Sequence, residues 1–222
     1  MEKLLNEKES LELIGQMINT AKNNLEKGTG KIFLLWGYLV AGISFGTCIL
    51  SMILPKQTAY DAYLLWFLMF FGIPFHFWLI KKRENERLVM TYIEKLMRWV
   101  WIGFTLSVLV VVVGMLLDTV ILSYFVSRVK EGNDFVYWFQ WLLLTPIMLC
   151  LYGFALFVSG KAYEFKPLVI GGIICFFASF FLFFSIHKTG VMYFQQFVLG
   201  VSAVAGFVIP GHMLNRKEYK NV

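Results

Sequence analysis

The sequence predicts an all-α polytopic membrane protein, with six transmembrane helices preceded by a cytoplasmic amphipathic helix. Hydrophobic residues make up 59% and charged residues 15% of the 222 positions, against about 45–50% and 25% in soluble domains. The charged residues gather in a few short stretches and leave long uncharged runs between them. A soluble fold of this size could not bury so much apolar surface.

The uncharged runs predict six spans, since a bilayer core about 30 Å thick needs about 20 apolar residues in a helix. We expect three parts: residues 1–30 as the amphipathic helix, 31–212 as the transmembrane bundle and 213–222 as a cytoplasmic tail. The predicted spans are residues 32–54, 62–80, 99–117, 135–158, 167–186 and 190–210. The third span is open at its end, because a second apolar run at residues 119–127 either continues it or turns along the outer surface.

The placement of Lys and Arg predicts the orientation. With the N-terminus inside, 16 of the 20 Lys and Arg residues fall on the cytoplasmic side. Such an excess is typical of cytoplasmic segments. Both termini are therefore expected in the cytoplasm, in a cell inner membrane, and the net charge of +6 is interpreted as attraction to anionic lipid and not to nucleic acid.

Two cytoplasmic segments are predicted to meet partners. Residues 6–27 carry apolar side chains at alternating gaps of three and four, which indicates an amphipathic helix within residues 1–30. Residues 81–98 repeat that pattern beside six basic residues, as a cytoplasmic extension of the third helix or a docking surface. The first segment could dock on its own bundle, lie in the lipid interface, or pair with a protein partner or a second copy.

The spans offer little for catalysis. Their central portions contain no Asp, Glu, Lys or Arg, the groups that usually mark ion or proton pathways in membranes. Three isolated cysteines, Cys48, Cys150 and Cys175, fall inside apolar runs without metal-ligand spacing. We therefore expect no enzymatic activity, no cofactor and no metal.

Two sets of polar residues are candidate sites. Gln140, Thr145, Gln195 and Gln196 could line a small polar pocket in the outer half of the membrane, near the kink expected at Pro146. The alternative is that they form interhelical hydrogen bonds. His76 and His212 each follow a proline at the inner end of a span and could form a pair, or could bond the backbone carbonyls that the prolines free.

Small residues predict close helix packing. Gly42 and Gly46 form a GxxxG pattern in the first span, and Gly200 and Gly206 recur in the sixth. Such faces permit helices to approach closely, either inside the bundle or between two copies.

Several stretches resemble a family of small six-span inner-membrane proteins from Bacteroidetes-type bacteria. They are residues 9–18, 30–38, 158–160, 165–173 and 209–212, the last two reading FKPLVIGGI and IPGH. The resemblance implies a bacterial inner membrane and supplies no catalytic residues. The residues themselves leave two expected functions. The cytoplasmic segments 1–30 and 81–98 favour a non-enzymatic, signalling-associated interaction protein, and the polar residues near Pro146 favour a transporter or channel for a small neutral or lipid-like solute.

Overall fold

The computed structural model describes residues 12, 15, 29–55, 59–85, 92–126, 134–186 and 191–220. All elements within these residues are helical. Most of the predicted amphipathic helix at residues 6–27, and the centre of the segment at 81–98, lie outside them.

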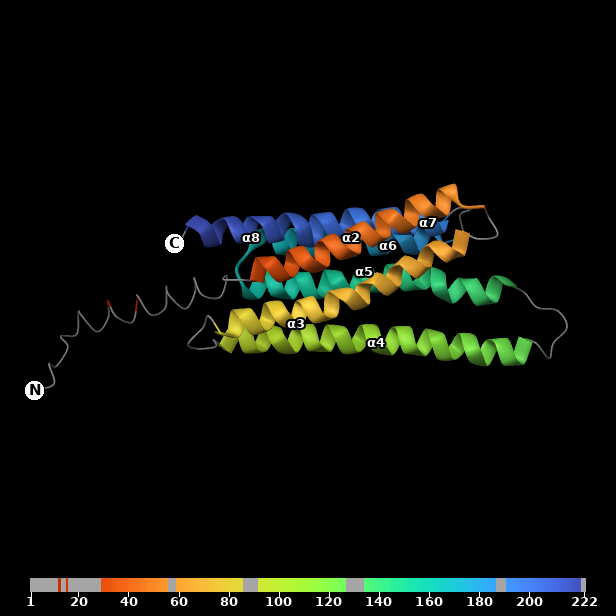
Figure 1. Ribbon diagram of the computed structural model, residues 1–222, viewed down its shortest axis with the longest axis horizontal. Coiled ribbons are helices and arrows are strands. Elements are labelled where there is room, and N and C mark those ends of the chain that lie inside the picture. Colours follow the sequence, from red (N-terminus) through yellow and green to blue (C-terminus); the bar gives the residue numbers. More distant parts are fainter. Residues whose placement is uncertain are drawn as a thin grey trace, which may run out of the picture.

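The described chain contains six helical spans that are long and apolar enough to cross a membrane. The protein is therefore an all-α, multi-pass membrane protein. The elements are α2 (Thr29–Ile53), η1 (Ala59–Leu68), α3 (Met69–Asn85), α4 (Tyr92–Val126), α5 (Asp134–Ala162), α6 (Lys166–Ser185), α7 (Val191–Ala203), the π-helical turn η2 (Val204–Val208) and α8 (Ile209–Lys220). The spans run back and forth along one axis, and α2 begins at the same end of the bundle at which α8 finishes (Figure 1).

Helix α4, which forms the third span, is longer than the sequence predicted. It runs without interruption from Tyr92 to Val126, so residues 119–126 continue the third span rather than turning along the surface. Asp118 is exposed within this helix. A single exposed carboxylate leaves the backbone hydrogen bonds of a helix intact, which explains why the apolar run continues past it.

The core lies between four of the six spans. Buried residues of the main cluster come from α2, α5, α6 and the sixth span, and include Leu149, Leu156, Leu168 and Leu182. The most apolar stretches of these four spans are 39–56% buried, against 6% in the second span and 0% in the third. In Figure 1, α4 forms one edge of the bundle. The protein thus has a four-span core with two peripheral spans.

The turn between α5 and α6 is fixed by backbone geometry. Glu164 adopts a left-handed conformation, with φ of 51°. The amide of Phe165 donates to the carbonyl of Gly160 at 2.8 Å, and that of Glu164 donates to Lys161 at 3.2 Å. This is a Schellman motif, and Pro167 then stands in the first turn of α6, where its missing N–H costs nothing. The motif sets α5 and α6 against each other as a hairpin.

Candidate functional site

The polar residues of the outer half centre on the proline in α5. Pro146 has no N–H, so it cannot donate to the carbonyl of Leu142 four residues earlier. Gln195 of α7 fills that gap: its Nε2 donates to the Leu142 carbonyl oxygen at 2.8 Å. Gln195 is 3% exposed. Its amide therefore links the sixth span to the fourth, as the interhelical alternative predicted.

A second side chain bonds the same region of α5. Ser179 of α6 donates from its hydroxyl to the carbonyl oxygen of Pro146 at 2.7 Å. Thr145, the residue before Pro146, is also buried. Gln196 is also buried, and its Oε1 has no hydrogen-bond partner among the described residues. Gln140 belongs to α5, but its side chain lies outside the described part. Three of the four predicted pocket residues, Thr145, Gln195 and Gln196, are thus buried, and Gln195 bonds the carbonyl that Pro146 leaves without a helical partner.

The two histidines contact different side chains of α2. Trp36 donates from Nε1 to Nδ1 of His76 at 3.1 Å, and the hydroxyl of Tyr38 lies 2.6 Å from Nε2 of His212. Trp36 and Tyr38 are two residues apart, which separates them by about 200° around a helix. His76 and His212 therefore meet opposite sides of α2. Their hydrogen-bond partners here are aromatic side chains, not the backbone carbonyls that the prolines free.

The side chains that could bind a metal ion are also spread over the structure that is described. Within the described ranges, no group of three His, Cys, Asp or Glu residues could hold a metal ion. The three cysteines are free thiols, with Cys48 and Cys175 buried and Cys150 exposed.

The predicted packing glycines divide into two groups. A Cβ on Gly200 would come within 2.9 Å of the Phe45 ring, and one on Gly206 within 2.8 Å of Leu156. Both glycines therefore lie where helices pack closely. Gly46 faces Leu65 at 3.3 Å, whereas Gly42 faces open space. The GxxxG pattern of α2 is thus not used as one internal packing face.

The closest helix contacts use glycines beyond those four. A Cβ on Gly171 would lie 2.7 Å from the Cα of Gly206, and one on Gly160 would lie 2.5 Å from the Val169 amide nitrogen. Gly171 belongs to the pair of glycines that is visible in the sequence of the fifth span. The partner of each glycine depends on helix register, which the sequence pattern alone does not give.

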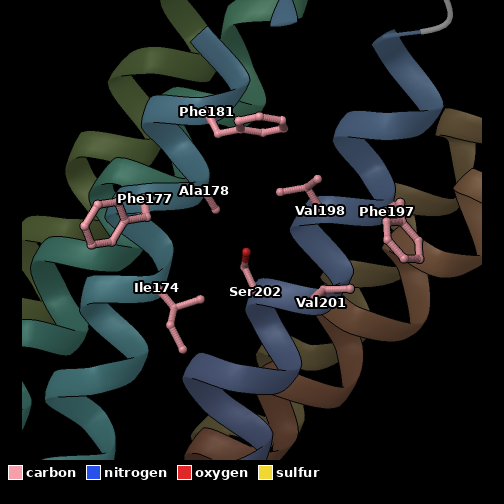
Figure 2. Close-up of a pocket in the computed structure, with 8 residues that line it drawn as sticks. All are labelled: Ile174, Phe177, Ala178, Phe181, Phe197, Val198, Val201 and Ser202. Atoms are coloured by element: carbon pink, nitrogen blue, oxygen red, sulfur yellow. The ribbon is translucent and has the colours of Figure 1, made fainter. Parts of the chain in front are cut away.

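A groove between α6 and α7 is a feature that the sequence did not predict. It has a volume of about 400 Å³ and opens on the lipid-facing surface. Figure 2 shows its eight lining residues, all apolar except one serine: Ile174, Phe177, Ala178, Phe181, Phe197, Val198, Val201 and Ser202. The small residues at the facing positions Ala178 and Ser202 are the one feature of the sequence that could have indicated this groove.

Comparison of the chain with protein families, with curated proteins and with solved structures finds no match. The function must therefore be argued from the geometry of the chain.

Proposed function

We propose that this is a non-enzymatic membrane protein that acts by binding a partner in the membrane, with α4 as the main contact surface. The observation that carries the proposal is the exposure of α4. None of its most apolar stretch is buried, although this is the most hydrophobic of the six spans.

The inner half of α4 is anchored to the core. Trp101 packs edge-on against Phe33 of α2, with ring centroids 5.7 Å apart, and Phe104 lies 5.2 Å from Tyr152 of α5. These contacts fix which side of the helix faces inward. Away from these contacts, Leu106, Val110 and Leu117 of α4 are each more than half exposed.

One flank of α4 is suited to close helix contact. At 100° per residue, Gly103, Ser107 and Gly114 share a flank about 120° from the anchored side. A Cβ on either glycine would meet nothing within 4 Å. Small residues at such spacing let a second helix approach closely. This flank is hereafter the α4 flank, defined by Gly103, Ser107 and Gly114.

The basic end of the bundle supports a cytoplasmic contribution to the same function. Lys81, Lys82 and Lys95 are exposed near the facing ends of α3 and α4. Together with residues 1–30 they would add an electrostatic contact to lipid or to the cytoplasmic part of a partner. We place this end in the cytoplasm of a bacterial cell, at the inner membrane, on the basis of the Lys and Arg distribution.

The interior favours this function over solute passage. Leu149, Leu156 and Leu182 are at most 1% exposed in the middle of the bundle, and the amide of Gln195 is already bonded to backbone. A transporter for a small neutral solute would need an open path across the bundle, and these leucine side chains fill its middle.

Photo-crosslinking in cells tests the proposal. A benzophenone amino acid at Val110, beside the α4 flank, should give a protein adduct. The same group at Phe184 is the matched control, because Phe184 is 70% exposed on α6 and Val110 is 67% exposed on α4. An adduct of twice the chain mass would identify a second copy, and another mass a different protein. Equal labelling at both positions, or lipid adducts alone, would refute α4 as the contact surface.

A further inference from the structure

The groove between α6 and α7 arises because the two helices touch at one level and separate above it. Gly171 of α6 lies against Gly206 of η2, the turn that directly follows α7. Toward the outer end, Ala178 and Ser202 are too small to fill the widening space, and a groove of about 400 Å³ remains (Figure 2). It begins just beyond the π-helical turn Val204–Val208. Such turns interrupt regular helix packing and are frequent at functional sites.

The groove lies well inside the membrane. Its lining residues on α6 run from Ile174 to Phe181, which places them about 12–22 Å along a helix about 30 Å long. This range covers the middle and the outer half of the span. The surrounding medium at that depth is hydrocarbon.

One polar group points into this apolar space. The hydroxyl of Ser202 projects into the groove (Figure 2), although the residue is 2% exposed overall. Ser107 of α4, for comparison, donates to the Gly103 carbonyl of its own helix at 2.9 Å. Ser202 has no hydrogen bond to any residue that the structure describes. A hydroxyl left unpaired in hydrocarbon is costly.

The lining favours one kind of occupant. A buried water needs two to four polar partners, and the seven other lining residues are apolar. A plain acyl chain would fill the groove but leave the hydroxyl unpaired. We propose that the groove binds a neutral lipid carrying a carbonyl oxygen, which accepts a hydrogen bond from Ser202 while its chain lies against Phe181 and Val198. This site is independent of the α4 flank.

The test uses decylubiquinone, a neutral lipid with carbonyl oxygens, and hexadecane as a competitor that has only the hydrocarbon chain. Purified full-length protein in detergent is incubated with the quinone and passed through gel filtration. The quinone retained beyond that of protein-free micelles is then measured. The natural chain should retain the quinone in a stoichiometric amount, and an equal concentration of hexadecane should displace little of it.

Three variants separate the parts of the proposal. Ala178→Phe fills the groove and should abolish retention, whereas Val120→Phe places the same new side chain on α4, outside the groove, and should leave retention unchanged. Ser202→Ala keeps the groove but removes the donor and should weaken binding about tenfold. Equal retention by the natural chain and Ala178→Phe would overturn the site. Equal affinity of Ser202→Ala and the natural chain for the quinone, or substantial displacement of the quinone by an equal concentration of hexadecane, would overturn the hydrogen bond.

Discussion

Gln195 of α7 donates its amide hydrogen to the one carbonyl in α5, that of Leu142, which Pro146 deprives of a helical partner. The two residues are 53 positions apart in the sequence. A carbonyl that proline leaves unpaired and a buried glutamine amide, each unfavourable alone in a membrane, therefore satisfy each other. The pair is a specific hydrogen bond between the sixth span and the fourth.

Replacing Gln195 tests this relationship. Gln195→Leu leaves the Leu142 carbonyl unpaired and should lower the free energy of unfolding in detergent by about 1–2 kcal/mol. In a Pro146→Ala background the amide of residue 146 can donate to Leu142, so the same change should cost less than about 0.5 kcal/mol.

The matched control for that cycle is Gln196→Leu, since Gln196 is equally buried but its Oε1 has no partner among the described residues. Its cost should be the same with Pro146 or with Ala at position 146. If Gln195→Leu costs as much after Pro146 is replaced, the proline is not the reason for the bond.

The six spans could be predicted from the sequence because each depends only on local apolar length. The continuation of the third span could not, since Asp118 within an apolar run is compatible with either a helix or a turn. The carbonyl that Pro146 leaves without a helical partner could also be predicted. The donor could not, because pairing Gln195 with Leu142 requires the relative register of two spans that are distant in the sequence.

The same limit applies to the groove and the glycines. The pattern of the fifth span shows Gly171 and Gly172, but not that Gly171 meets Gly206. The groove follows from that contact together with the small residues at 178 and 202. Sequence periodicity indicates which residues could lie on a packing face, and three-dimensional register decides which of them do.

The glycine contacts predict opposite effects at two positions. Gly171→Ala should lower the free energy of unfolding by about 1–3 kcal/mol, because the new Cβ would meet the backbone of Gly206. Gly42→Ala is the control on α2, where the Cβ meets open space. It should be neutral or stabilise the protein by up to about 1 kcal/mol through helix propensity. Unfolding in a denaturing detergent series measures both, and a larger loss at Gly42 would contradict the packing.

The histidine contacts predict two independent pairs. His76→Phe breaks the bond to Trp36, and His212→Phe breaks the bond to Tyr38. Because the histidines meet opposite sides of α2, the double variant should lose the sum of the two single losses, within about 0.5 kcal/mol. The melting temperature in zinc and in a chelator should also be the same. A coupling energy well above that limit, or a zinc-dependent rise lost in both variants, would instead support a shared site.

The distribution of Lys and Arg predicts opposite exposure for the two ends of the second span, Asp61–Lys82. Both terminal residues are exposed, so cysteines there report their side of the membrane in a chain whose own three cysteines are replaced. Asp61→Cys should react with a membrane-impermeant maleimide in intact cells, and Lys82→Cys only after the cells are opened. The reverse pattern would invert the orientation, put the basic end outside and remove the expected cytoplasmic contact through residues 1–30 and 81–98. The proposals for the α4 flank and for the groove do not depend on the orientation, because both surfaces lie within the membrane spans.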